Sequence, residues 1–481
     1  MPSLLRSVLS IFSGRVAGIL ISLAFTPLLV RILSQSQYGV YASVLAGYSV
    51  ITILSGGGLF DATRKFIAEQ DEIFSNDSAI ITTAFLISAI YAVVTSAIIL
   101  SSVALGIVPR RYISFAWILI AAVLFINLFN IVRGSFYGLH RESVGEVLKI
   151  TQKLIYVISA LILAYYGLGV FGVFTGYTFS FVILSVYGIV LLFREVPPML
   201  PDIDKFTKFG KKMASFGGYQ LLGGLSAMLL YRSDILLINF FKGSSTTALY
   251  QSAIVPAEMI WFVPSAIQLA FLQHTASLWS SNEIDKISEN LHIGIKYSIL
   301  SLTLFGAGLF VLSDSFLRVY FGSSYAQAAL TLQILIFGTF FFGISRTIVP
   351  VFQATGWIKQ TELITVCALI LNLLLNTILI PRYGIIGAGV GTATSYVAIF
   401  IGNTLLWRYS PFKFVSVKWI SKVILPQVIF SVIFFTISIT INISPLNKML
   451  VLPPIGLIVF LILNILFGHI PIHSIRTKLG L

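Results

Sequence analysis

The sequence predicts an all-α polytopic membrane protein with about 14 transmembrane helices that use nearly the whole chain. Three observations predict this fold class. Only 10% of the 481 residues are charged and 57% are hydrophobic, whereas roughly 25% of the residues in a soluble domain are charged. Mean hydropathy is +0.97. Apolar runs of about 20 residues recur without period-two alternation, which favours helices over a membrane barrel.

The apolar runs of spanning length place the predicted helices in three sets along the chain. The first set lies near residues 8–30, 38–59, 78–106, 112–138, 150–166 and 170–193. The second set lies near 213–241, 250–279, 293–313, 326–352, 361–380 and 385–407. A final pair lies near 421–443 and 451–468.

Loop charge predicts the orientation, because short cytoplasmic loops collect Lys and Arg. With the N-terminus inside, 20 of the 31 Lys and Arg residues fall in inner segments, 7 in outer segments and 4 within spans. We therefore expect a multi-pass protein of the cytoplasmic (plasma) membrane with both termini in the cytoplasm. The first run carries Arg15 and is long enough to span, so we expect it to remain as the first helix rather than be cleaved as a signal peptide.

The sequence contains few residues that could bind a metal ion or take part in redox chemistry. Its single cysteine, Cys367, excludes a disulfide within the chain and a cysteine metal site. The five histidines are scattered without metal-ligand spacing, so we expect no metal and no cofactor. No G-x-x-x-x-G-K-[ST] motif occurs, which removes ATP hydrolysis, and the G-x-G-x-x-G run at 167–172 lies between two spans, where a tight turn explains it better than a dinucleotide site. We expect a protein that is not an enzyme, with no catalytic residues and no nucleic-acid partner.

The longest polar connection, residues 194–212, combines three prolines with four lysines. This pattern is typical of a membrane-surface segment that is attracted to anionic lipid. The segment can also serve as a linker between two lobes. We therefore expect an N-lobe at 1–200, a C-lobe at 201–407 and a C-terminal helix pair at 408–481.

The two predicted lobes resemble each other in sequence. The run that leads to Tyr41 matches the run that leads to Tyr250, Arg133 matches Arg346, and Tyr166-Gly167 matches Tyr383-Gly384, each roughly 210 residues apart. An even number of helices in each half makes this a parallel repeat about an axis along the membrane normal. Such repeats are typical of transporters with a site at the midplane between the lobes.

Arginines within spans are the most informative residues. Arg15, Arg133, Arg232 and Arg346 each cost roughly 2.5 to 3.5 kcal/mol at a helix centre unless they face water or a partner. Snorkelling to the membrane surface is the alternative explanation for each. Guanidinium groups bind phosphate oxygens bidentately, so the four arginines are candidate ligands for an anionic passenger.

Acidic residues within the predicted spans are fewer than the arginines. Asp234, Glu258 and perhaps Asp61, at the end of the second helix, are candidates for coupling transport to an ion. Four cations against two or three anions leave a net positive interior, whereas a cation exporter should show the opposite sign.

Two short segments allow both a structural and a functional interpretation. Gly14 and Gly18 flank Arg15, and these small residues serve either close helix packing or space for a head group. Arg64 and Lys65 follow the second helix as either an ordinary basic loop or a patch that receives phosphate from the cytoplasm.

Several stretches resemble the polysaccharide flippases of the multidrug/oligosaccharidyl-lipid/polysaccharide exporter superfamily. They are residues 28–41, Arg232-Ser233-Asp234, 248–250 with Pro256, 321–325, 353–356 and, most specifically, the run from Leu371 to Ala388. The likeness spans roughly residues 8 to 407. It implies two six-helix lobes around a central cavity and translocation of a glycan on a polyprenyl phosphate or diphosphate.

The resemblance leads us to expect a glycan-lipid flippase that works by alternating access, with membrane lipid around it and a glycan polymerase or glycosyltransferases as candidate partners. A cation-coupled small-molecule exporter and a lipid II flippase remain open; the Ser-Arg-x-x-Gly-like element of the latter matches residues 13–18 only with an inserted glycine. A membrane glycan polymerase or ligase is the enzyme alternative, but the predicted outer loops are short.

Overall fold

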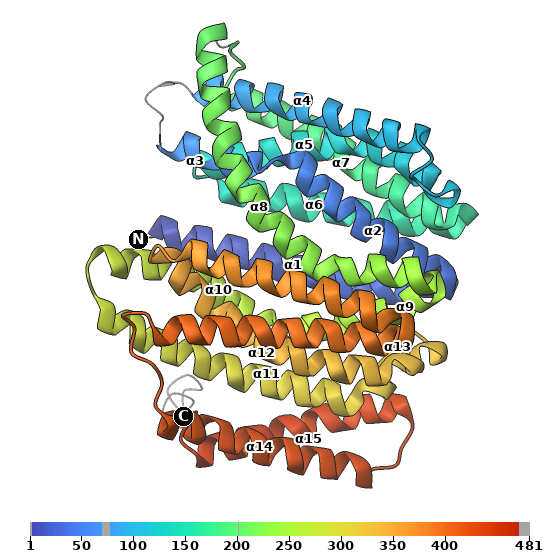
Figure 1. The fold of residues 1–481 in the computed structure, drawn as a ribbon, viewed down its shortest axis with the longest axis vertical. Helices are drawn as coiled ribbons and strands as arrows, with labels where there is room; N and C mark the ends of the chain where they lie inside the picture. The colour runs from blue at the N-terminus through green and yellow to red at the C-terminus, as the bar shows by residue number, and fades with distance from the viewer. Residues whose placement is uncertain (1, 70–76, 201, 471–481) are drawn as a thin grey trace. The chain divides into compact units, whose positions relative to one another are not determined.

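The computed structural model describes residues 2–69, 77–200 and 202–470 (Figure 1). Over these residues the chain is helical and contains no β-strand. The bounds of the longer helices are α1 Pro2–Ile32, α2 Gln35–Gly56, α3 Leu59–Glu69, α4 Asp77–Ala104, α5 Ile113–Gly138, α6 Glu142–Leu163, α7 Gly169–Glu195, α8 Ile203–Lys242, α9 Ser244–Met259, α10 Phe262–Ser280, α11 Ile284–Tyr320, α12 Ala329–Ala354, α13 Ile358–Arg408, α14 Val417–Thr440 and α15 Pro445–Leu466.

The described residues include 10 helical stretches that are long and apolar enough to cross a membrane, or 11 if α9 and α10 form one bent span. The all-α membrane fold is therefore confirmed, while the number of 14 spans stays a prediction. Two of the stretches, Glu142–Glu195 and Ile358–Arg408, have 54 and 51 residues, which is more than twice the roughly 20 residues that a span needs.

Glycines in left-handed or extended positive-φ conformations break both long stretches. Gly167 has φ 93° and Gly169 has φ 50°, so the chain breaks between α6 and α7 at the start of the G-x-G-x-x-G run, whereas residues 169–172 belong to α7. Gly384 (φ 58°) interrupts α13. A side chain with a Cβ is strained at such φ values, whereas glycine adopts them readily.

The chain divides into two compact units, Met1–Leu236 and Leu237–Leu481. The boundary between them falls inside α8. The division expected from the sequence, at 200 and 407, stays a prediction.

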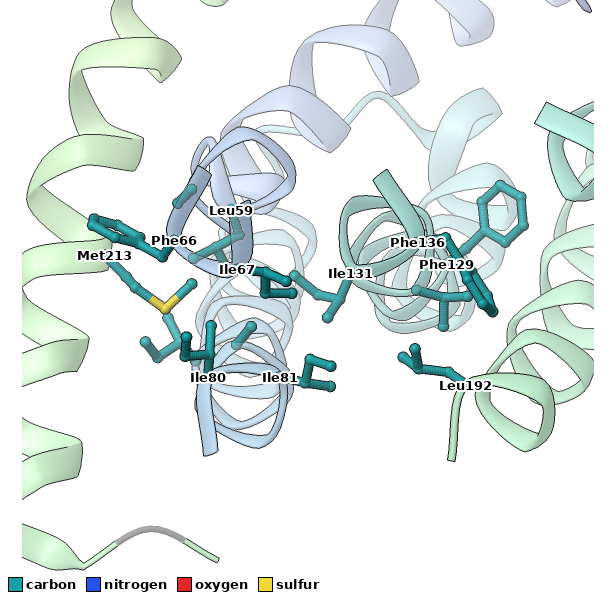
Figure 2. Packing of buried hydrophobic residues seen from close by; sticks show 14 of the residues in the cluster. Leu59, Phe66, Ile67, Ile80, Ile81, Phe129, Ile131, Phe136, Leu192 and Met213 are labelled. Carbon is teal, nitrogen blue, oxygen red and sulfur yellow. The ribbon is translucent and has the colours of Figure 1, made fainter. Parts of the chain in front are cut away.

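The core of the first unit is an apolar cluster between α3, α4, α5, α7 and α8, which Figure 2 shows from close by. Phe66 of α3 packs edge-on against Phe209 of α8, and Phe129 of α5 packs against Phe181 of α7. Met213 brings α8 into the same cluster. This packing holds the short helix α3 in the first unit.

Buried polar side chains join the helices of the second unit. Tyr250 of α9 lies 3.2 Å from the Thr392 hydroxyl of α13, and Asn372 Nδ2 donates to the same hydroxyl over 3.3 Å. Gln427 Nε2 of α14 donates to Asn464 Oδ1 of α15 over 2.8 Å. Figure 1 shows α14 and α15 (red) running side by side at the end of the chain.

Two predicted helices were too short at their N-terminal ends, and one predicted site residue lies in a different helix. Residues 142–149 belong to α6, residues 203–212 belong to α8, and Asp61 lies in the separate helix α3 rather than at the end of the second helix. The criterion of apolar length ends a span at the first charged residue. A helix can instead continue into a charged segment, because its backbone hydrogen bonds do not depend on an apolar surround.

Candidate functional site

Arg15 lies in α1, and its side chain is outside the part of the chain that the structure describes. The small residues beside it allow α6 to approach. A Cβ at Gly14 would collide with the Glu146 carboxylate, and Lys153 Nζ donates to the Gly18 carbonyl oxygen. Close helix packing, one of the two interpretations of these glycines, is therefore what the structure contains.

Arg133 of α5 forms a buried ion pair that the sequence did not suggest. Its Nη2 lies 3.6 Å from Glu146 Oε1, and the exposed fractions of the two side chains are 14% and 3%. The Tyr137 hydroxyl donates to the same carboxylate. On the other side, the guanidinium lies 5.3 Å from the centre of the Phe60 ring. A carboxylate thus balances the charge of Arg133.

Glu146 is the partner of Arg133 that sequence reasoning missed, because residues 139–149 were taken as a loop. The spacing of charged residues in this segment could have indicated a helix. Glu146, Lys149 and Lys153 have i, i+3, i+7 spacing and so share one face of a helix. Lys149 Nζ lies 3.5 Å from Glu146 Oε2, which makes this face a charged stripe of α6.

Arg346 of α12 has a different set of partners. Its Nη1 donates to Gln268 Oε1 over 3.1 Å and to the Ser265 hydroxyl over 3.5 Å. The guanidinium lies 4.6 Å from the centre of the Trp261 ring and 5.3 Å from that of Phe342. Aromatic faces attract a cation, so the Trp261 and Phe342 rings stabilise the guanidinium of Arg346.

The surroundings of Arg133 and Arg346 share one feature within their own units. Each guanidinium lies over an aromatic ring at a break between two helices. The ring is that of Phe60, after α2, for Arg133 and that of Trp261, after α9, for Arg346. A shared feature of this kind is what the predicted internal repeat leads us to expect.

Arg64 and Lys65 lie on the amphipathic helix α3. Arg64 Nη2 lies 3.2 Å from Asp61 Oδ1, with exposed fractions of 49% and 35%. Lys65 Nζ lies 3.9 Å from Glu69 Oε2 and 4.4 Å from the centre of the Phe216 ring. Exposed ion pairs of this kind contribute little to stability, so both cations can exchange a carboxylate for another anion.

The remaining candidates lie on α8 and α9. Asp234 is 1% exposed, and the backbone N–H of Ile235 donates to its Oδ1 over 2.7 Å. Arg232, two residues earlier, is partly buried, as is Glu258 of α9. The first unit thus carries all the candidates except Glu258 and Arg346. The ion pair between Asp61 and Arg64 joins two predicted site residues.

A large apolar groove opens in the second unit. It has a volume of about 800 Å³ and is lined by α11, α12, α13 and α14 together with Phe414 and Val415. Of the last two helices, α14 contributes to the lining and α15 does not. Among the described residues, no group of three or more His, Cys, Asp and Glu side chains could hold a metal ion.

Family models match most of the chain. Residues 4–272 match the model described as polysaccharide biosynthesis protein, and residues 222–378 match the MatE model. The first match covers more than half of the chain and therefore shows the family.

Relatives with the same overall length occur in archaea. Agl15 of Haloferax volcanii, named a probable low-salt glycan biosynthesis flippase, is 26% identical over 429 residues, 86% of this chain and 85% of that protein. AglR, a probable flippase of the same organism, is 22% identical over 422 residues, 85% and 84% of the two chains. With the uncharacterized membrane protein MJ1068 of Methanocaldococcus jannaschii, the 22% identical match spans 50% of this chain and 48% of the relative.

Solved structures share the fold. The lipid II flippase MurJ in an inward closed conformation matches with a TM-score of 0.76 at 15% identity, over 97% of this chain and 99% of that one. An inward-facing multidrug resistance MATE family transporter matches with a TM-score of 0.64 at 16% identity, over 81% and 94%. At these identities the likeness shows the fold alone.

Proposed function

Because the chain belongs to the polysaccharide biosynthesis protein family, within the multidrug/oligosaccharidyl-lipid/polysaccharide exporter superfamily, we propose that it is a flippase for a lipid-linked glycan. The passenger is a glycan on polyprenyl phosphate or diphosphate, carried from the cytoplasmic to the outer leaflet. The observation that carries this proposal is the set of arginines in helices apolar enough to span a membrane, above all Arg346, which contacts Trp261 and Gln268.

The phosphate is the part of the passenger that costs most to move across the membrane. A charged group in the hydrocarbon core is expensive, and guanidinium forks offset this cost by binding phosphate oxygens. Arg15, Arg232 and Arg346 take this role. Arg133 contributes less to phosphate binding, because Glu146 already balances its charge.

Alternating access moves the head group past the membrane while the polyprenyl tail stays in lipid. Arg64 and Lys65 receive the phosphate at the cytoplasmic face, where both side chains are accessible. The apolar groove of about 800 Å³ suits the hydrocarbon tail. No covalent bond breaks during this cycle, so the protein acts as a transporter rather than as an enzyme.

Coupling of transport to an ion belongs to Asp234 and Glu258. A carboxylate that is only 1% exposed in a span is costly to keep ionised, so a proton or a metal cation can neutralise it during the cycle. Asp234→Asn and Glu258→Gln should reduce transport that an ion gradient drives.

The chemistry of the passenger indicates which enzymes act before and after the protein and in which membrane it acts. Glycosyltransferases on the cytoplasmic side supply the lipid-linked glycan, and a glycan polymerase or transferase outside consumes it. The protein therefore acts in the cytoplasmic membrane with both termini inside.

Reconstituted proteoliposomes with a labelled polyprenyl diphosphate glycan test this function, with head-group accessibility read from each side. Arg346→Ala and Arg232→Ala should each lower flipping by at least roughly tenfold, and Arg→Lys should keep part of the activity because a point charge replaces a fork. Arg318→Ala is the matched control, since Arg318 is exposed and pairs with Asp314. Full activity in the Arg232→Ala, Arg346→Ala double variant would contradict the proposal.

A cation-coupled exporter is the second candidate, and the burial of Asp234 is the observation that favours it. The arginine variants separate the two functions, because an exporter tolerates these substitutions and the flippase does not. Asp234→Asn should reduce ion-driven transport in both cases.

A further inference from the structure

A second, smaller cavity lies within the first unit. It has a volume of about 240 Å³ and is lined by residues of α2, α3, α4, α5 and α8 around the break between α2 and α3. Gly57 (φ 53°) and Gly58 (φ 68°) form this break. A Cβ at Gly58 would collide with the backbone of Gly217, so the break also lets α8 close one side of the cavity.

Two buried polar atoms at the cavity have no hydrogen-bond partner among the described residues: the Ser88 hydroxyl and Asn127 Oδ1. The side chains are 0% and 3% exposed. Asn127 Nδ2 donates to the carbonyl oxygen and the hydroxyl of Ser55 over 3.0 and 2.7 Å, which fixes the amide with Oδ1 as an acceptor. Buried polar groups without partners are costly, so this arrangement is suited to a ligand that brings hydroxyl groups.

The rest of the lining alternates polar and apolar groups. Asp61, Asn130 and Gln220 add a carboxylate and two amides, while Leu59 and Ile126 belong to the apolar wall. Amide and carboxylate groups can each bond to two neighbouring hydroxyls. A sugar ring has hydroxyls around its edge and C–H groups on its faces, and this lining complements both.

The volume of the cavity and the charge of its lining disfavour a metal cation, a phosphate and an anionic sugar. A water molecule takes about 30 Å³, so a cavity of about 240 Å³ is much larger than a single metal cation needs. No Lys or Arg occurs among its described lining residues, which disfavours phosphate. The carboxylate of Asp61 repels an anionic sugar.

The cavity adjoins the predicted phosphate patch. Asp61 lines the cavity, and its Oδ1 lies 3.2 Å from Arg64 Nη2 on the same helix, where both side chains are partly exposed. A phosphate that displaces Asp61 from Arg64 would therefore lie beside the cavity. In a polyprenyl-linked glycan, the sugar bonded directly to the phosphate is the one that would reach it.

We propose that this cavity binds the sugar bonded to the carrier phosphate and selects an uncharged ring by its hydroxyl groups. The inference rests on the proposed flippase function and names the part of the glycan that the protein recognises. Ser88, Asn127, Asn130 and Gln220 bond to the hydroxyls, and Asp61 rejects acidic sugars. This use of Asp61 replaces the ion-coupling role that the sequence suggested for it.

Binding of five synthetic polyprenyl diphosphates to the purified full-length protein tests the proposal. One carries a methyl cap, three carry glucose, galactose or N-acetylglucosamine, and one carries glucuronic acid. At least one neutral sugar should bind roughly tenfold tighter than the methyl cap, the effect of one or two net hydrogen bonds. Glucuronic acid should show no gain.

The variants separate the cavity from the phosphate patch. Asn130→Ala with Gln220→Ala should remove most of the preference for sugar and leave the affinity for the methyl cap unchanged. Asp61→Asn should let glucuronic acid bind better than the methyl cap. Ser226→Ala on α8 is the matched control, since Ser226 bonds within its own helix and does not line the cavity.

Three outcomes would overturn the proposal. Equal binding of the neutral-sugar and methyl carriers would contradict the sugar site and leave the flippase function standing. A change in ion dependence on Asp61→Asn with no change in sugar preference would make the cavity a cation site. Failure of all five carriers to bind would contradict the proposed function together with this inference.

Discussion

At the scale of single residues, the pairing of Arg133 with Glu146 changes the charge of the first unit. A sequence-based tally of embedded charges left Arg133 as an isolated cation, but a buried carboxylate lies 3.6 Å away. Buried ion pairs add little net stability, yet each partner alone is costly in an apolar surround. The pair therefore has a structural role at the contact between α5 and α6.

Single and double substitutions should separate the two roles of this pair. Arg133→Met or Glu146→Gln alone should destabilise the protein by about 3 to 5 kcal/mol, and the double variant should recover a large part of this loss. Thermal unfolding in detergent measures the effect. Arg141→Met is the matched control, because the Arg141–Glu195 pair is about half exposed and its loss should cost less than about 1 kcal/mol. A double variant as unstable as the sum of the singles would contradict the pairing.

At the scale of elements, close approach of helices depends on particular glycines. A Cβ at Gly338 of α12 would collide with the backbone of Ala393 in α13, whereas a Cβ at Gly308 of α11 would meet nothing within 4 Å. Small residues at helix contacts allow backbones to pack closely in a membrane. The contact between α12 and α13 is therefore set by residue size and is intolerant of even one methyl group.

Alanine substitutions at these two glycines should have opposite effects. Gly338→Ala should destabilise the protein by about 1 to 3 kcal/mol, because the backbone of α13 must shift. Gly308→Ala, the matched control, should be neutral or stabilise it by up to about 1 kcal/mol, because alanine favours the helix. Equal melting temperatures for the two variants would show that α12 and α13 are not in this contact.

At the scale of the whole molecule, α8 connects the two units as one helix of 40 residues. At 1.5 Å per residue it is about 60 Å long, twice the roughly 30 Å of the hydrocarbon core. Its ends should therefore lie on opposite sides of the membrane. The distribution of Lys and Arg in the sequence predicts that Lys208 lies inside and Lys242 outside.

Cysteine labelling checks this orientation in a Cys367→Ser background. Single cysteines at Lys208 and Lys242, both exposed positions, should react differently with a membrane-impermeant reagent added from outside. We expect Lys242→Cys to react and Lys208→Cys to be labelled only after the membrane is opened. The reverse pattern would invert the predicted topology.

The sequence by itself determined the fold class and led to the type of passenger that we propose. Composition and apolar run length predict a helical membrane protein because the bilayer leaves few other solutions for the backbone. Arginines such as Arg346, placed in spans, indicate an anionic ligand because their cost must be offset. Both conclusions depend on residue type and position along the chain, which the sequence contains directly.

Only the tertiary structure decided which of these residues act together. It paired Arg133 with Glu146, placed Asp61 on a separate helix beside Arg64 and brought Ser88 and Asn127 to one cavity. Such contacts join residues that lie on different helices or in segments whose helix boundaries a hydropathy criterion misplaces. Contacts between helices depend on rotation and close packing, and a pattern of apolar runs specifies neither.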